Sequence, residues 1–137
     1  MTIKSTILGP GSLKLGETGS QREFAAQLTK CSITVNVETE DDVDVLSGET
    51  LEGEETYTYD LTGTILQDFD LDSLEDYCFT NRGTKEPFVF TPNDDADRIF
   101  TGIVRIRPVT RGGDVKKRNT SDFSFRIIGD YTPAEAA

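Results

Sequence analysis

The chain has 137 residues, 25 of them acidic and 14 basic, which gives a formal net charge of −11 at neutral pH. This length suits one domain and is short for two, and a content of 35% apolar residues, including eight Phe, separates the chain from a disordered acidic tail. The sequence contains no histidine, which excludes Ser-His-Asp and Cys-His catalysis and removes most zinc sites.

The same composition bears on the compartment in which the protein is made. No apolar run approaches the roughly 18 residues of a membrane span, and residues 1–5 lack the apolar region of a secretory signal, so we expect synthesis in a cytoplasm and no membrane partner. Cys31 and Cys78 are then expected to be free thiols. Because the sequence has no Trp, their spacing gives little support to an immunoglobulin-type domain.

The first expected strands lie before residue 39. Residues 12–15 form a short strand, and the segment 16–20 has the composition of a turn. Apolar and polar residues alternate over 31–38, which predicts a strand with one buried and one solvated face. The apolar positions before it, at 24, 26 and 28, have the opposite phase, so we expect one long strand with a bulge near residues 29–30. The inward positions after the bulge are Cys31, Ile33, Val35 and Val37.

A second alternation covers residues 56–65, with Tyr57, Leu61 and Ile65 on its apolar face. Between the two strands, residues 39–55 are acidic and contain one short apolar piece at 43–46. We interpret this segment as a long acidic loop or a hairpin extension. Connections of this length in compact domains are usually functional or disordered.

One helix is expected over about residues 72–82. Asp72 followed by Glu75 matches a capping box, apolar residues recur at helical spacing from Leu74 to Cys78, and Gly83 suits the C-terminal end. The apolar stripe is expected to face the core, with the helix covering an edge or end of a sheet.

The rest of the chain returns to the period of a strand. Residues 88–90 precede a turn at 91–95, residues 99–107 form another strand, and residues 121–128 form the last one, with Phe123, Phe125 and Ile127 inward. A basic loop occupies about 110–120, and residues 131–137 are expected to be a flexible tail. The sum is one mainly β domain over residues 1–137, a β-sandwich or partly closed barrel with one flanking α-helix.

Charge is distributed unevenly along the sequence. Residues 31–81 contain 15 carboxylates and no Lys or Arg, whereas residues 98–126 contain eight basic and two acidic residues. Two readings stay open: a solvated acidic face with a solvated basic loop, or head-to-tail association in which unlike ends of successive copies meet. Complementary patches set orientation more than affinity, and a head-to-tail contact propagates into rings or filaments.

Motifs for chemistry are weak. Asp68, Asp70 and Asp72 have a calcium-like spacing, but an EF-hand loop requires Gly and Glu where this chain has Ser73 and Phe79. The many carboxylates single out no pair for glycoside hydrolysis, and the basic segment 111–118 lacks the aromatic residues that accompany nucleic-acid binding. We therefore expect no catalytic residue, no metal and no cofactor, and predict a non-enzymatic structural protein.

Seven segments, in order, resemble the major tail proteins of siphophages that infect actinobacteria. Where that family often has Trp, this chain has Tyr59, Phe100 and Phe125. The resemblance covers about two-thirds of the chain. The segments are 46–50 (LSGET), 59–68 (YDLTGTILQD), 74–84, 87–93 (PFVFTPN), 100–104 (FTGIV), 112–115 (GGDV) and 121–125 (SDFSF).

This resemblance implies a tail tube fold in which six copies close into a ring-shaped β-barrel and rings stack into a tube. Long loops and terminal arms would bridge successive rings. Tape measure, tail terminator and tail tip proteins would be further partners, and double-stranded DNA would pass through the bore without specific binding. The protein would be made in the host cytoplasm and reside in the virion tail.

The charges acquire roles in such a tube. Carboxylates facing the bore would repel phosphate, whereas Lys and Arg would bind it. The candidates for lining the bore are Glu38, Glu40, Asp41, Asp42, Asp44 and Asp60. The candidates for ring–ring contacts are Glu49, Glu52, Glu54, Glu55, Arg111, Lys116, Lys117 and Arg118.

Two other classes remain as alternatives. One is a different virion structural protein, such as a tail terminator or capsid decoration protein, or a β-sandwich binding module. The other is an acidic enzyme that works without histidine.

Overall fold

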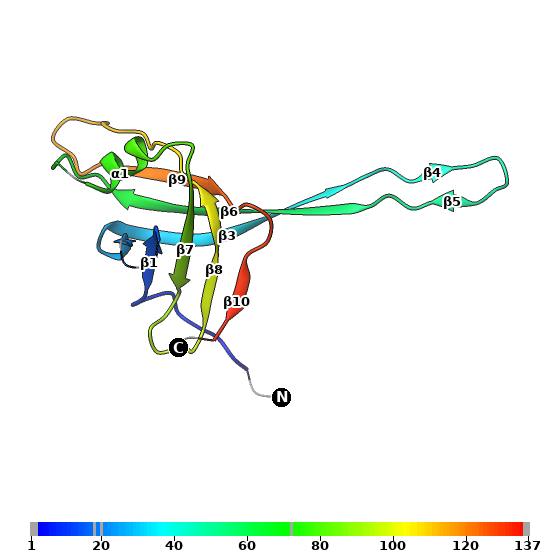
Figure 1. Cartoon of the computed structure of the whole chain (residues 1–137), viewed down its shortest axis with the longest axis horizontal. Coiled ribbons are helices and arrows are strands. Elements are labelled where there is room, and N and C mark those ends of the chain that lie inside the picture. Colours follow the sequence, from blue (N-terminus) through cyan, green and yellow to red (C-terminus); the bar gives the residue numbers. More distant parts are fainter. Residues whose placement is uncertain (1–2, 18, 20, 72, 136–137) are drawn as a thin grey trace.

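The computed structural model describes residues 3–17, 19, 21–71 and 73–135. These residues form a body from which a long β arm projects (Figure 1). One sheet has the strand order β10-β8-β7-β1-β2, a second has β3-β6-β9, and a third, at the end of the arm, pairs β4 with β5. The strands are β1 (Ser12–Leu15), β2 (Arg22–Glu23), β3 (Leu28–Thr39), β4 (Val43–Asp44), β5 (Thr50–Leu51), β6 (Glu55–Leu66), β7 (Lys85–Thr91), β8 (Ile99–Arg105), β9 (Thr120–Arg126) and β10 (Thr132–Ala134). The expected mainly β class is confirmed.

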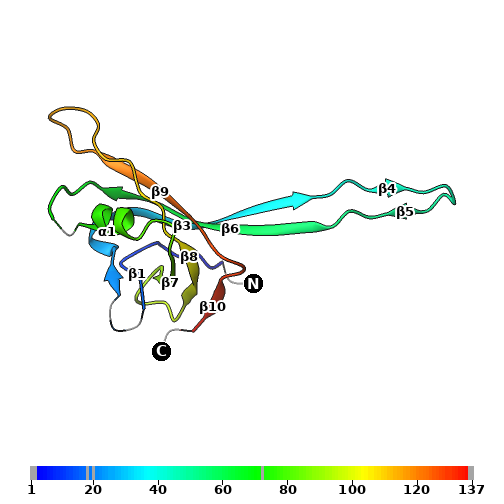
Figure 2. The same cartoon turned by 45° about the horizontal axis from the view of Figure 1, so that its top comes forward.

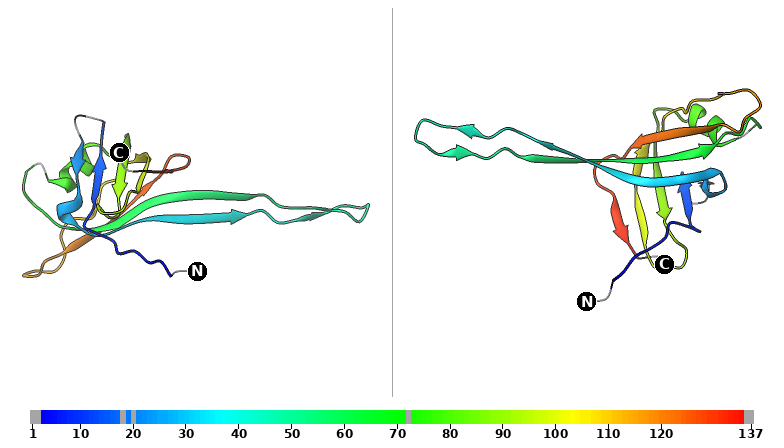
Figure 3. Two further views of the ribbon diagram at one scale, coloured as in Figure 1. Left: turned by 90° about the horizontal axis from the view of Figure 1, so that it is seen from below. Right: turned by 180° about the vertical axis from the view of Figure 1, so that it is seen from behind.

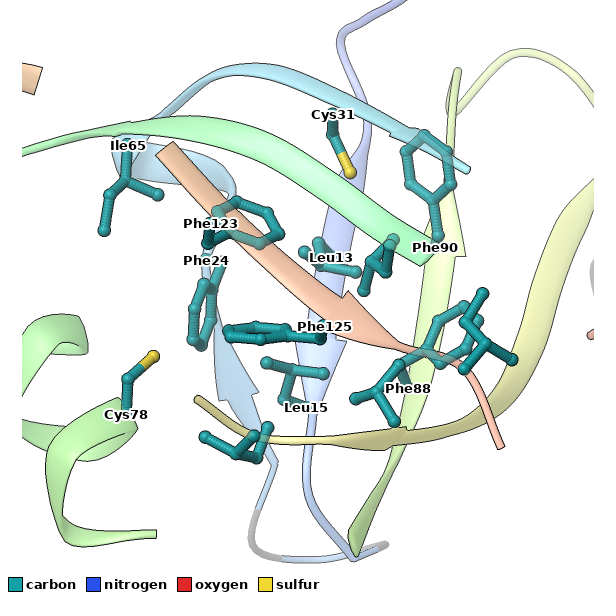
Figure 4. Packing of buried hydrophobic residues seen from close by; sticks show 14 residues of the cluster. Leu13, Leu15, Phe24, Cys31, Ile65, Cys78, Phe88, Phe90, Phe123 and Phe125 are labelled. Carbon is teal, nitrogen blue, oxygen red and sulfur yellow. The ribbon is translucent and has the colours of Figure 1, made fainter. Parts of the chain in front are cut away.

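The two larger sheets bury one core between them. Leu13 of β1 and Phe88 of β7 meet Phe125 of β9 there, and all three are at most 1% exposed (Figure 4). Phe123 and Ile127 are also buried, as the alternation over 121–128 predicts. This arrangement leaves the other face of the three-stranded sheet uncovered by the core.

The segment 39–55 is a hairpin extension. β3 and β6 pair without interruption from Lys30↔Thr64 to Thr39↔Glu55, and β4 and β5 continue the pairing with Val43 opposite Leu51. Seen from below and from behind, the arm runs clear of the body (Figure 3).

The start of β3 departs in part from the sequence prediction. The expected bulge is present, since the register shifts between Leu28 and Lys30. Residues 24–27, however, are not strand: Ala25–Gln27 forms a 3₁₀ turn. The Glu23 carboxylate accepts hydrogen bonds from the backbone N–H groups of Leu13 (3.1 Å) and Ala25 (2.9 Å). This turn directs Phe24, which is 0% exposed, into the core, so burial of one large ring overrides the period-two pattern.

The helix α1 spans Leu74–Thr80. Its N-cap is Ser73, whose hydroxyl accepts from the backbone N–H of Asp76 at 3.3 Å, while the expected cap, Asp72, lies outside the described residues. The C-cap is Asn81, and Gly83 follows with a φ of +80°, a conformation that glycine adopts easily. Within the described part of the chain, no helix has the length and apolarity to cross a membrane.

The C-terminal segment is more ordered than expected. Thr132–Ala134 forms the edge strand β10, which pairs with β8 through Thr132↔Thr101 and Ala134↔Ile99. Tyr131 makes edge-to-face contacts with Tyr59 (ring centroids 5.1 Å apart) and Phe100 (5.8 Å). The prediction of a flexible tail over residues 131–137 is therefore wrong for residues 131–134, which aromatic packing and a β ladder hold, while residues 136 and 137 lie outside the described part of the chain.

Candidate assembly surfaces

The uncovered face of the three-stranded sheet is polar across all three strands. Alternation places every second residue of β3, β6 and β9 on this face, and the register aligns them in rows, for example Thr34↔Asp60↔Arg126. Hydroxyl side chains predominate, so the face is wet without being uniformly charged. Its polar members are Lys30, Ser32, Thr34, Asn36 and Glu38 from β3, Thr56, Thr58, Asp60, Thr62 and Thr64 from β6, and Thr120, Asp122, Ser124 and Arg126 from β9. Leu66 of β6, which is 39% exposed, lies at its end opposite Thr120.

Side-chain hydrogen bonds cross the strands of this polar face. The Thr62 hydroxyl lies 3.0 Å from that of Ser32 and 3.1 Å from that of Thr34. Thr64 donates to the Asp122 carboxylate at 2.7 Å. Cross-strand pairs of this kind each contribute up to about 1 kcal/mol, and together they hold the outward side chains in register.

Asp60 lies at the centre of a charged cluster on the polar face. Arg126 donates through Nε to Asp60 Oδ1 at 2.7 Å, and Asn36 donates through Nδ2 to Oδ2 at 2.9 Å. The Asp60 side chain is 19% exposed and that of Arg126 is 45% exposed. The negative charge of Asp60 therefore has a positive partner on the same surface, which sequence reasoning did not identify.

The predicted bore-lining carboxylates fall into two groups. Glu38 and Asp60 share the polar face. The four between residues 40 and 44 lie farther out, beyond the end of β3. There Asp42 accepts from the backbone N–H of Gly53 at 2.8 Å, and Asp44 accepts from the Thr50 hydroxyl at 2.9 Å. The structure therefore does not bring the six candidates together on one surface of a single copy.

The opposite face of the arm carries an uncovered apolar stripe. Val35, Val37 and Tyr57 are 52%, 54% and 52% exposed, although the alternation predicts burial for the two valines. The prediction is wrong because the arm leaves the body beyond residue 34, where no second sheet covers it in the described chain. Val43, Val45, Leu46 and Leu51 extend the exposed set toward the tip.

Tyr57 is held on the arm by a neighbouring carboxylate. Its hydroxyl donates to Glu55 Oε2 at 2.5 Å, and this hydrogen bond, with the nearby negative charge, raises the pKa of Tyr57. Tyr57 therefore stays neutral at physiological pH and adds an amphipathic ring to the apolar stripe.

The basic loop, residues 110–119, is a constrained structure. The side-chain amide of Gln67 binds the start of the loop: it accepts a hydrogen bond from the backbone N–H of Gly112 (3.0 Å) and donates one to the Gly112 carbonyl (2.9 Å). Asn119 accepts from the N–H of Asp114 at 3.1 Å and donates to its carbonyl at 3.0 Å. This bonding shapes the loop so that Lys116, Lys117 and Arg118 are exposed near its end.

Arg111 differs from the other basic candidates for ring–ring contact. Its guanidinium lies 2.8 Å from Asp76 Oδ1 and 3.5 Å from Glu75 Oε2, so it is paired with α1 inside one copy. The acidic candidates all lie on the arm, at the opposite end of the molecule from the basic loop (Figure 2). Basic and acidic candidates thus do not meet within a copy. These acidic candidates are Glu49, Glu52, Glu54 and Glu55.

The class defined by this geometry is a mainly β fold of two packed antiparallel sheets with a polar outer sheet face and a projecting hairpin. No family model and no curated protein matches the sequence. Among solved structures, the chain is similar to one from the "Virion of native gene transfer agent (GTA) particle", with a TM-score of 0.60 and 22% identity over 89% of this chain and 95% of that chain. It is also similar to a chain from the "Tail of empty GTA particle computed with helical refinement, C6 symmetry", with a TM-score of 0.62 and 21% identity over 89% and 93%. The fold is therefore that of a chain found in gene transfer agent tails, over nearly the whole length of each.

Proposed function

We propose that this protein is the tail tube subunit of a long-tailed, phage-like particle of the siphophage type. Six copies would form a ring, and stacked rings would form the conduit through which DNA leaves the particle. The observation that supports this most directly is the likeness, over 89% of the chain, to a chain from a tail with C6 symmetry. The protein would act as a structural, non-enzymatic component of the virion tail.

The three-stranded sheet has the properties that a ring wall requires. β6 is its central strand, and in the described chain the outer edges of β3 and β9 carry no strand partner within their sheet. Exposed edges of this length template pairing with another chain. Joining β3 of one copy to β9 of the next would close six three-stranded sheets into a barrel. The polar face of each sheet would line the bore, and the face that packs on the core would point outward.

The arm and the basic loop would serve contacts between rings. The arm presents an uncovered apolar stripe together with Glu49, Glu52 and Glu54, and the basic loop presents Lys116, Lys117 and Arg118 at the other end of the molecule. Apolar surface left uncovered in a monomer marks an interaction site. Unlike charges at opposite ends would set the direction of stacking. Tape measure protein in the bore and terminator or tip proteins at the ends would complete the tail.

Negative-stain microscopy of concentrated protein tests the proposal, since a tube subunit should give long hollow polymers. Assembly should weaken as ionic strength rises, because salt screens the exposed charges. The triple variant Lys116→Gln, Lys117→Gln, Arg118→Gln should assemble less. A matched variant, Lys14→Gln, Lys85→Gln, Arg107→Gln, removes three exposed cations outside the loop and should assemble as the parent does.

The outcomes separate the candidate functions. Isolated rings that do not stack would favour a tail terminator instead of a tube subunit. Monomers at every concentration, with or without a nucleating tail tip complex, would overturn the proposal. Assembly that is indifferent to salt and to the triple variant would remove the charge-docking role of the basic loop.

A further inference from the structure

The polar face carries two cations, Lys30 and Arg126, within a surface proposed to face moving DNA. Lys30 lies in one row with Thr64 and the Asp122 carboxylate, near the start of β9. Arg126 lies in a row with Asp60 and Thr34, beside the point where the arm begins. A guanidinium in such a place would bind phosphate, because planar N–H pairs match phosphate oxygens and each contact releases counterions.

Arg126 is not held as an open phosphate ligand. Its Nε, which forms one edge of the guanidinium fork, donates to Asp60 at 2.7 Å. The second oxygen of Asp60 accepts from Asn36 at 2.9 Å, so the carboxylate is fixed from both neighbouring strands. The Asp60 side chain is 19% exposed and the Arg126 side chain is 45% exposed. The carboxylate is therefore the more firmly held member of the pair, and it fixes the position of the arginine.

We infer that Asp60 acts as a built-in counter-ion that withholds Arg126 from the phosphodiester backbone of passing DNA. This inference rests on the proposed function, and it changes the role of Asp60 from repelling DNA by its own charge to neutralising one arginine. An exposed ion pair contributes little to the free energy of folding. The role of this pair is therefore inferred from its position on the polar face. Asn36 is the positioning residue that keeps the carboxylate turned toward Arg126.

The test compares two isosteric changes that remove one negative charge each from the same face. Asp60→Asn frees Arg126, whereas Asp122→Asn removes a carboxylate bonded to Thr64 and frees no arginine. The readout on the unassembled chain is the salt concentration at which it elutes from immobilised duplex DNA, which detects weak binding. The readout on assembled tubes, checked by microscopy, is the amount of short duplex DNA that sediments with them.

Asp60→Asn should elute later than the parent and later than Asp122→Asn. One additional phosphate contact steepens the dependence of log affinity on log salt by about 0.9, which is about a threefold change per contact between 200 and 50 mM salt. The double variant Asp60→Asn, Arg126→Gln should return to the parent's behaviour. Tubes of Asp60→Asn should retain more DNA than tubes of Asp122→Asn or of the double variant.

Equal retention by Asp60→Asn and Asp122→Asn would mean that net charge alone matters and would overturn the inference. So would persistent binding by the double variant, since Arg126 would then not be the ligand. If the parent itself forms no tubes, with or without a nucleating tail tip complex, the proposed function fails, and the column experiment still reports whether Asp60 masks Arg126.

Discussion

Arg111 Nη1 lies 2.8 Å from Asp76 Oδ1 and thereby joins the base of the basic loop to the first turn of α1. The same guanidinium lies 3.5 Å from the carboxylate of Glu75, whose side chain is 1% exposed. Glu75 in turn accepts from the backbone N–H of Asp68 at 3.0 Å. A single arginine therefore connects the loop, the helix and the segment between β6 and α1.

Replacing Arg111 with Gln should destabilise the chain, because Glu75 would remain buried without its positive partner. Leaving a buried acceptor group uncompensated costs about 2 kcal/mol, and urea unfolding at neutral pH measures the loss. Lys117 pairs with Asp114 at 3.9 Å between side chains that are 71% and 77% exposed, so Lys117→Gln should change the free energy of unfolding by less than about 0.5 kcal/mol. The double variant Arg111→Gln, Glu75→Gln should recover part of the loss, and strict additivity would contradict the pairing.

The two thiols should be protected in the folded protein. Burial raises the pKa of Cys31 and of Cys78 from 9.0 to about 12, and the thiolate is the reactive form. At pH 8 a thiol reagent should therefore react slowly with the native chain and rapidly with both cysteines in urea. Rapid labelling of the native chain at pH 8 would show that these side chains are accessible.

The same shift predicts a pH dependence of stability. Since the folded pKa of each thiol exceeds the unfolded value, the unfolded state ionises first as pH rises. The contribution of the thiols is complete below pH 9 and is lost progressively as pH rises from 9 toward 12. A Cys31→Ala, Cys78→Ala variant should lose less stability over this range than the parent does.

Gly63 occupies an inward position of β6 that leaves no room for a side chain. A Cβ atom there would collide with the backbone carbonyl oxygen of Lys30 and lie 2.8 Å from Cε1 and Cζ of Phe123. Gly63→Ala should destabilise the chain by about 2 kcal/mol, as overpacking of a core does. Thr62→Ala, one residue away on the polar face, loses hydroxyl contacts with Ser32 and Thr34 and should cost less. Equal midpoints of urea unfolding for the two variants would contradict the tight packing at Gly63.

The sequence predicts the strands well where local alternation and burial agree. β1 begins and ends where the pattern indicates, and Phe123, Phe125 and Ile127 are buried as their spacing predicts. Val35 and Val37 show the limit of this reasoning. Alternation tells which face of a strand is apolar, but a second layer of structure decides whether that face is covered.

The candidate surfaces were less predictable, because they depend on register between distant strands. Alternation indicates that Asp60 and Arg126 both point outward, but their pairing joins residues 66 positions apart. The pairing of Asp60 with Arg126 follows from the register of β6 against β9, and packing of the core determines that register. Arg111 was missed as an internal partner for the same reason, since its contact with α1 depends on the path of the loop.

Removing the end of the arm should separate assembly from folding. Glu40 and Glu54 bond across the arm, with the Glu40 N–H donating to the Glu54 carbonyl at 2.9 Å. Replacing residues 41–53 with Asn-Gly closes the arm there with a favoured two-residue turn. The deleted segment contains no residue of the buried core, so the free energy of unfolding should change by less than about 1 kcal/mol.

Polymers, in contrast, should no longer form if the arm bridges rings, because the shortened chain lacks the distal apolar residues Val43, Leu46 and Leu51 and five carboxylates. Sedimentation velocity and negative-stain microscopy on the same samples measure both size and form. A full-length variant, Leu46→Ser and Leu51→Ser, keeps every charge and tests the apolar contribution alone. Rings that survive in the shortened chain would place the ring contacts in the body and the stacking contacts in the arm, whereas undiminished tubes would contradict a bridging role for the arm.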